Sequence, residues 1–121
     1  MPVLRRLTDT RAFVTRDGSE IRELLHPHNA EVRNQSLAEA VVAPGETTLL
    51  HRHHVSEEIY FIRQGSGHMQ LGDEAFEVRA GDAILIPPGT PHCIRNNGKE
   101  TLHILCMCAP AYSHEDTELL E

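Results

Sequence analysis

Histidine is the residue type in this sequence that most clearly points to chemistry. The 121 residues include nine histidines, and six of these lie between His51 and His103. Imidazole titrates near neutral pH and is the commonest metal ligand in proteins. The stretch from His51 to His103 is therefore where a metal-binding site is expected.

The spacing of four side chains in this stretch suits one shared ion. His51 and His53 are two residues apart, so on a strand both side chains point to the same face. Glu58 begins the next predicted strand after a short turn, and His92 follows a sharp bend at residues 87–89, which read Pro-Pro-Gly. Three imidazoles and one carboxylate form a mixed nitrogen and oxygen set that suits one divalent Fe, Mn, Ni, Co, Cu or Zn ion and leaves room for water or substrate.

The elements that must position these side chains are predicted to be strands. Apolar periodicity predicts nine short strands and almost no helix, and clusters of Gly, Pro and Asn separate them. So many short strands are typical of an all-β sandwich or barrel. The tail from Ser113 predicts a short helix, with Ser113 as its cap and Asp116 as the capping-box acid. The predicted strands are residues 21–25, 37–42, 47–51, 58–63, 67–71, 75–79, 83–86, 93–95 and 102–108.

Two segments resemble the two conserved motifs of the cupin family, and the resemblance covers residues 45–96. The first, at 45–65, reads Gly, five residues, His-x-His, four residues, Glu, six residues, Gly. The second, at 81–96, reads Gly, five residues, Pro-x-Gly, two residues, His, three residues, Asn. The ten matching positions are Gly45, His51, His53, Glu58, Gly65, Gly81, Pro87, Gly89, His92 and Asn96.

The resemblance implies an all-β cupin fold, a double-stranded β-helix or jelly-roll barrel with one metal held inside by three His and one Glu. It also implies a single small bacterial-type cupin domain over residues 1–121. Residues 1–44 would add N-terminal strands to the barrel, and residues 109–121 would form the C-terminal tail.

Two neighbouring residues compete with the proposed ligands. His54 would point to the opposite face of its strand from His53. Counting six residues back from Gly65 selects Glu58 over Glu57, and Glu57 is then expected to be a solvated turn acid. The metal ligands predicted by the sequence are His51, His53, Glu58 and His92.

The pocket around these ligands is predicted to be mostly apolar with one phenol, Tyr60, as the candidate catalytic side chain. Arg52, Arg63 and Arg95 alternate outward, so a phosphorylated sugar would lack its usual clamp. Alternation along the last predicted strand, 102–108, does not decide whether the face with His103 or the face with Cys106 points into the pocket. The expected inward neighbours are Thr47, Leu49, Tyr60, Ile62 and Ile94.

Because cupins include both enzymes and binding proteins, the resemblance leaves three functions open. The first is a metal-dependent dioxygenase, decarboxylase or isomerase acting on a small organic acid, enol or diol, with Tyr60 or a nearby His moving a proton. The second is a non-catalytic module that binds a small carboxylate or sugar through the metal. The third is a domain in which the metal mainly stabilises the barrel.

The composition of the chain indicates which classes of partner the protein binds and where in the cell it is expected. The net charge of −7 repels phosphate backbones, so no nucleic-acid partner is predicted. Apolar runs are too short to cross a bilayer and no secretory signal is recognised, so a cytoplasmic protein is expected.

Strands 58–62 and 102–108 are apolar on both faces, which predicts a homodimer that covers an outer face. The three cysteines are expected to be reduced.

Overall fold

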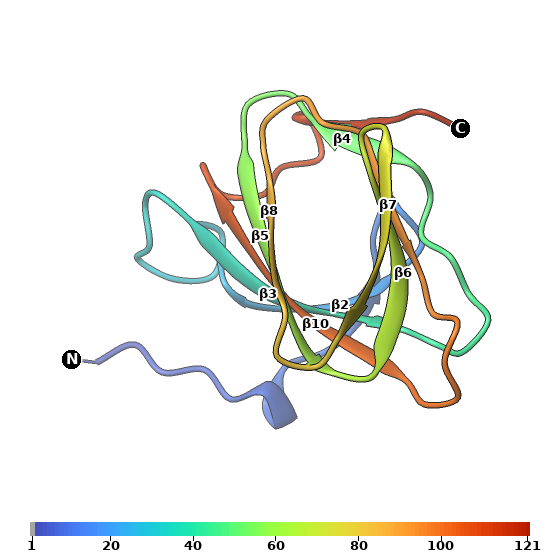
Figure 1. The fold of residues 1–121 in the computed structure, drawn as a ribbon. Coiled ribbons are helices and arrows are strands. Elements are labelled where there is room, and N and C mark those ends of the chain that lie inside the picture. Colours follow the sequence, from blue (N-terminus) through green and yellow to red (C-terminus); the bar gives the residue numbers. More distant parts are fainter. Residues whose placement is uncertain (1) are drawn as a thin grey trace.

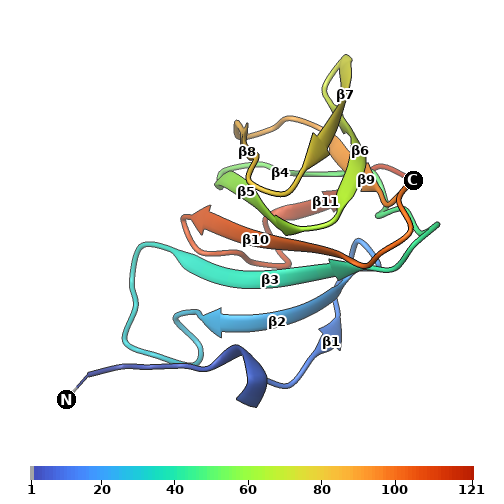
Figure 2. The same ribbon diagram turned by 60° about the horizontal axis from the view of Figure 1, so that its bottom comes forward.

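The computed structural model describes residues 2–121 and arranges them as two antiparallel sheets that enclose a barrel (Figure 1). In Figure 2 the strands β2, β3 and β10 run side by side across the first sheet. A short 3₁₀ turn at Leu7–Asp9 precedes the strands. Within residues 2–121 no helix has the length and apolar character needed to cross a membrane.

The first sheet has six strands in the order β1 (Phe13–Val14), β2 (Glu20–Leu25), β3 (Ser36–Val42), β10 (Leu102–Ala109), β5 (Glu57–Gln64) and β8 (Ala83–Ile86). The second has five strands in the order β11 (Thr117–Leu119), β4 (His51–His53), β9 (His92–Arg95), β6 (Ser66–Leu71) and β7 (Glu74–Arg79). This is the jelly-roll arrangement expected from the sequence.

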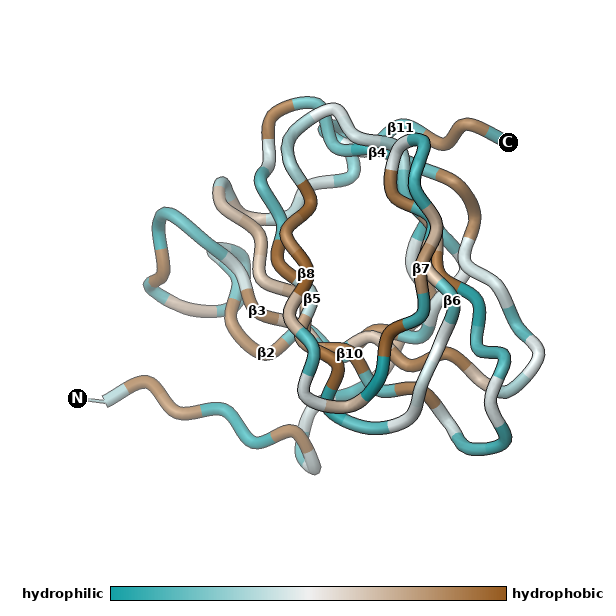
Figure 3. The backbone as a smooth tube through the Cα atoms, in the orientation of Figure 1, coloured by the Kyte–Doolittle hydropathy of each residue, from teal (hydrophilic) through white to brown (hydrophobic). Residues whose placement is uncertain are grey.

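Alternation along the strands places one set of side chains inside the barrel. On β5, Glu58, Tyr60 and Ile62 are buried while the residues between them are exposed, as a strand with one inward face requires. Apolar segments of the backbone gather along β8 and β10 in Figure 3. Burial of these side chains removes apolar surface from water and is the main stabilising contribution to the fold. The fully buried apolar residues are Ile62, Met69, Ile86, Ile94, Leu102 and Ile104.

Eight of the nine predicted strands are present, and each of their ends lies within one residue of the predicted end, but strand 47–51 is wrong. The strand that carries the histidines, β4, starts at His51. Upstream of it, Thr48 donates its backbone N–H to Ile94 while Leu49 donates to Asp17. Because successive backbone groups bond to different elements, this segment leaves the regular ladder, and its side chains do not keep the inward and outward alternation assumed from the sequence.

The predicted C-terminal helix is also wrong. The cap hydrogen bond forms, since the Asp116 N–H donates to Ser113 Oγ at 3.1 Å, but the chain then continues as strand β11. Thr117–Leu119 pairs with β4, and the Asp116 carboxylate accepts the backbone N–H groups of Val55 and Ser56. A segment too short to be a stable helix alone gains more from these long-range partners.

Two of the motif glycines turn the chain between strands, and only one of them is also crowded. Gly65 and Gly81 both have positive φ, 89° and 96°, a region that disfavours residues with a Cβ. A Cβ at Gly65 would lie 2.8 Å from the carbonyl oxygen of Thr101, whereas a Cβ at Gly81 would meet nothing within 4 Å.

This difference predicts unequal costs for the same substitution. Gly81→Ala should lower the free energy of unfolding by about 1 kcal/mol, from the backbone conformation alone. Gly65→Ala adds a backbone clash and should cost about 2 to 4 kcal/mol. Urea denaturation of the two variants measures both values, and equal costs would contradict the close approach at Gly65.

Candidate metal centre

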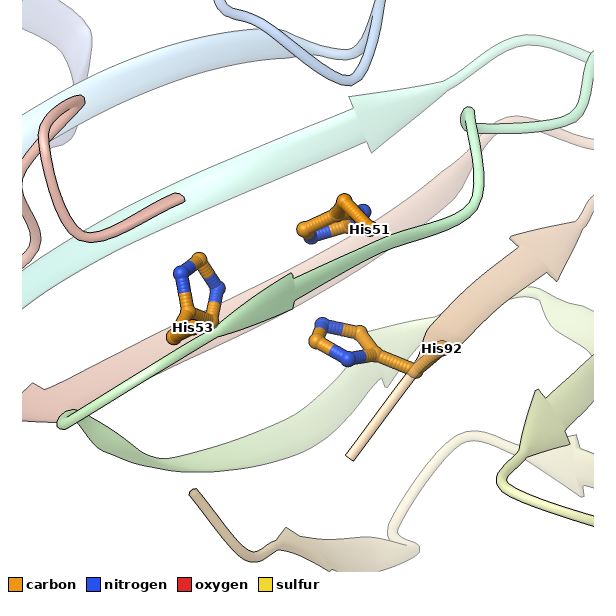
Figure 4. Close-up of side chains that lie close together, drawn as sticks. All are labelled: His51, His53 and His92. Atoms are coloured by element: carbon orange, nitrogen blue, oxygen red, sulfur yellow. The ribbon is translucent and has the colours of Figure 1, made fainter. Parts of the chain in front are cut away.

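Three of the predicted ligands meet inside the barrel. His51 and His53 come from β4, and His92 comes from the start of β9, where it pairs directly with His51. All three are buried, and Figure 4 shows their rings close together, those of His51 and His53 on β4 and that of His92 at the start of β9. One ring nitrogen from each lies within 4.8 Å of the other two. The three-histidine cluster can therefore hold a metal ion.

Each imidazole is fixed by a hydrogen bond at its Nδ1. The carbonyl oxygens of Leu49 and Thr90 lie 2.8 and 2.9 Å from Nδ1 of His51 and His92. A carbonyl oxygen only accepts, so Nδ1 of both rings carries the hydrogen. Each Nε2 is then left with a lone pair directed at the centre of the cluster.

The third imidazole, that of His53, is held in the same way by a hydroxyl group. Thr117 Oγ1 lies 2.9 Å from His53 Nδ1 and donates its own hydrogen to the carbonyl oxygen of Ser113 at 2.9 Å. Its remaining role toward His53 is that of an acceptor. All three rings therefore share one tautomer, with Nε2 free to bind a cation.

The Glu58 carboxylate lies beside two of these nitrogens. Its Oε1 is 3.1 Å from His53 Nε2 and 3.6 Å from His92 Nε2. Burial alone would raise the pKa of Glu58, but His53 and His92, when their Nε2 atoms carry a proton in the absence of a metal, outweigh burial and lower the pKa to about 2. Glu58 is therefore ionised at neutral pH.

The four groups together require a positive charge. Three imidazole lone pairs and a carboxylate face one another in a buried space, and within the described chain Glu58 Oε1 and His92 Nε2 find no hydrogen-bond partner of acceptable geometry. Buried acceptors without a donor are costly. Either a proton on an imidazole or a metal ion relieves this, and the nitrogen and oxygen donor set fits a divalent transition metal.

His54 and Glu57, the two alternatives to the predicted ligands, both lie outside this cluster, as predicted. His54 is exposed, and its Nε2 is 3.2 Å from the Glu118 carboxylate on the neighbouring strand β11. Glu57 is exposed at the start of β5.

A pocket opens beside His51, His53 and Glu58 and extends to β1, β2, β3 and β10. Tyr60 lines it as predicted, with its ring centre 6.0 Å from that of His92. Burial, followed by the nearby Glu58 charge, raises the pKa of Tyr60 well above its usual value, so its hydroxyl keeps its proton at neutral pH.

Two predicted pocket residues are placed wrongly. Thr47 and Leu49 are exposed, because the irregular segment before β4 shifts their orientation. Ile62 and Ile94 point inward as expected and belong to the apolar core.

The structure shows which face of the last predicted strand, now β10, lines the pocket. Cys106 and Cys108 line the pocket, and His103 instead lies 3.5 Å from the Glu39 carboxylate outside the site. Burial and the Glu58 carboxylate raise the pKa of both thiols, which remain protonated. All three cysteines are free, as predicted.

Sequence reasoning missed two residues of the site, Asp17 and Thr117. Asp17 lies in the turn between β1 and β2, with Oδ2 3.8 Å from His51 Nε2. Thr117 anchors His53 from β11. Neither belongs to a recognisable motif, and both reach the histidines only through long-range folding of the N- and C-terminal segments.

Comparison with known proteins gives the family. The model of the Cupin_2 family, described as a cupin domain, matches residues 38–108. This is more than half of the chain, which therefore belongs to the cupin family. The cupin fold expected from the ten motif positions is confirmed.

Individual relatives extend over most of the chain. The uncharacterized protein MJ1618 of Methanocaldococcus jannaschii is 59% identical over 109 residues, which are 90% of this chain and 87% of that protein. Protein SchB of Streptomyces halstedii is 32% identical over 108 residues, 85% of this chain and 78% of SchB. The structure of the polyketide cyclase RemF from Streptomyces resistomycificus is similar with a TM-score of 0.84 and 25% identity, covering 100% of this chain and 87% of RemF.

The lowered pKa of Glu58 predicts how acid destabilises the metal-free protein. Because the pKa is about 2 in the folded chain against 4.5 ordinarily, ionised Glu58 stabilises the fold above pH 4.5. This contribution, on the order of 3 kcal/mol, is lost as the pH falls from 4.5 toward 2. Urea unfolding of chelator-treated protein between pH 6 and 2.5 should show the loss in the wild type and a flatter profile for Glu58→Gln. Parallel profiles would contradict the ionised, histidine-bonded carboxylate.

Proposed function

We propose that this chain is a metal-dependent enzyme that acts on a small oxygen-rich molecule, such as an organic acid, an enol or a diol. One divalent transition metal would be held by His51, His53, Glu58 and His92. The observation that carries this proposal is the convergence of three imidazole lone pairs and a buried carboxylate at one side of a pocket. A dioxygenase, decarboxylase or isomerase reaction would each use such a centre.

The chemistry of the pocket supports a substrate bound through oxygen. A divalent ion bound at the histidines supplies positive charge that polarises a carbonyl or enolate oxygen. Tyr60, which stays protonated, would donate a hydrogen bond or a proton to a substrate oxygen. Apolar side chains such as Phe13 and Ile21 line the rest of the pocket and would hold the carbon skeleton and exclude water.

Similarity to RemF also supports an enzyme. Its name, polyketide cyclase, denotes catalysis on a molecule that carries several oxygen functions. The same kind of oxygen-rich molecule would suit the pocket of this chain.

Incubating a metabolite extract with the metal-loaded protein separates an enzyme from a binding module. For an enzyme, mass spectrometry should show one compound consumed and another formed over many turnovers, and His92→Ala should abolish the change. A small carboxylate or sugar that copurifies at one molecule per chain and stays unaltered would contradict catalysis. That result would support a metal-dependent binding module.

The ligand assignment predicts which histidine variants lose the metal. His53→Ala and His92→Ala each remove a lone pair from the centre and should weaken metal binding at least about tenfold. His54→Ala is the matched control, because His54 is exposed and faces Glu118, and it should keep one metal per chain. Elemental analysis after dialysis measures all three. Loss of metal from His54→Ala with retention in His53→Ala would reject this set of ligands.

We also propose that the chain forms a homodimer through the outer face of the first sheet. Ile59 and Phe61 on β5 and Leu85 on β8 are exposed there, and Ile59 pairs directly with Leu85 and with Met107 of β10. Neighbouring apolar side chains on one face favour association. A second copy presents the same face, so a two-fold contact would cover both.

Light scattering tests the dimer. At micromolar concentration the mass should be about 27 kDa, twice the 13.6 kDa of one chain. Leu85→Glu places a charge on the proposed contact and should shift the mass toward that of one chain. Val55→Glu changes a valine that is also exposed, in the loop before β5, and should leave the dimer intact. A wild-type mass of one chain would reject the proposal.

A further inference from the structure

Asp17 brings a second carboxylate to the metal pocket from a different part of the chain than Glu58. Glu58 lies on β5 and approaches His53 and His92. Asp17 lies in the β1–β2 turn and approaches His51, with Oδ2 3.8 Å from Nε2. That nitrogen is the one left free for a metal, since Nδ1 of His51 donates to the Leu49 carbonyl oxygen.

The Asp17 side chain is held in place rather than loosely exposed. It is 9% exposed, and its Oδ1 accepts hydrogen bonds from the backbone N–H and the hydroxyl of Ser19 at 2.9 and 2.6 Å. Its backbone carbonyl accepts the N–H of Leu49 at 2.8 Å, which ties the turn to the segment leading into β4. In the part of the chain that the structure describes, Asp17 Oδ2 receives no hydrogen bond, and it faces His51.

The lining of the pocket has no basic side chain to offset these acids. Among the described residues that line it, none is Lys or Arg, while Asp17, Glu23 and Glu58 are all present. The histidines bind a metal in their neutral form. A divalent ion with Glu58 alone would leave a charge of +1, and the added charge of Asp17 brings the ion and the two carboxylates beside the histidines to zero. Glu23, whose carboxylate lies 4.0 Å from His26 Nε2, adds a further acid to the lining.

We propose that Asp17 is the second carboxylate of this metal pocket and that its charge makes the metal-loaded pocket take a neutral ligand in preference to an anion. This rests on the proposed metal function and narrows its substrate class. A neutral diol, enol or phenol fits a metal-loaded pocket without net positive charge, whereas an organic acid would face the repulsion of the nearby carboxylates.

The test uses Asp17→Asn, which replaces Oδ2 by a neutral amide and keeps an oxygen for Ser19. Asp82→Asn is the matched control, because Asp82 also accepts a backbone N–H in a turn, that of Arg79 at 2.8 Å, and does not line the pocket. Co²⁺ titration should show at least tenfold weaker binding to Asp17→Asn than to the wild type, with Asp82→Asn within twofold of the wild type.

Anion binding should change in the opposite direction. With Co²⁺ at saturation, azide followed by the visible spectrum of the ion should bind at least tenfold more tightly to Asp17→Asn than to the wild type. Imidazole at pH 8, a neutral ligand, should bind both proteins within about threefold. Asp17→Glu restores the charge and should return azide affinity toward the wild-type value.

Co²⁺ binding and azide binding together distinguish an effect of the Asp17 charge from a structural role of Asp17. Weaker binding of both Co²⁺ and azide to Asp17→Asn would assign Asp17 a structural role and overturn the proposal, as would unchanged binding of both. If Asp17→Asn does not fold, Asp17→Ser removes the same charge and the same criteria apply. Wild-type protein that binds no Co²⁺ would overturn the metal function itself, whereas normal Co²⁺ binding with azide affinity equal in all variants would overturn this inference alone.

Discussion

The structure depends on one constraint at its centre: three imidazoles must present their Nε2 lone pairs to the same buried point. Each ring is prevented from turning its other nitrogen inward by an oxygen at Nδ1. Two of those oxygens are backbone carbonyls on the segments just before β4 and β9, and the third is the Thr117 hydroxyl on β11. The loops and the edge strand around the site therefore fix its chemistry as much as the histidines do.

Glu58 adds to this constraint because a carboxylate beside three lone pairs leaves the centre short of positive charge. The barrel tolerates this because rigid strands hold the groups on both sides, so they cannot move apart to reach water. Such an arrangement is typical of a functional site, where unfavourable electrostatic interactions between buried groups persist because the chemistry of the site uses those groups.

The convergence of His51, His53, Glu58 and His92, and most of the fold, could be predicted from the sequence because both follow from short-range regularities. His51 and His53 share a face through the two-residue period of a strand, and Glu58 and Tyr60 share the inward face of β5 for the same reason. The bend at residues 87–89 ends β8 and frees the chain to return as β9 with His92. Glycines and prolines marked the strand ends well enough to predict eight strands.

The errors lie where partners distant in sequence decide the structure. Residues 47–51 are predicted to be a strand, but their backbone hydrogen bonds go to Ile94 and Asp17 in turn. The tail from Ser113 has a helix cap, but its next residues pair with β4. Asp17 and Thr117 stand in no motif, so their approach to the histidines could be known only after the barrel was folded.

Thr117 and His53 are 64 residues apart in sequence, and this separation bears on how the protein folds. Forming the site requires the closure of long loops, whose entropy is lost before any contact at the centre is gained. Chains with many such distant pairings fold slowly compared with those built from local contacts. The ring of His53 can be fixed only once β11 has docked on β4, so the centre is complete only after that long-range contact has formed. A cation that arrives earlier would meet mobile imidazoles instead of a preorganised site.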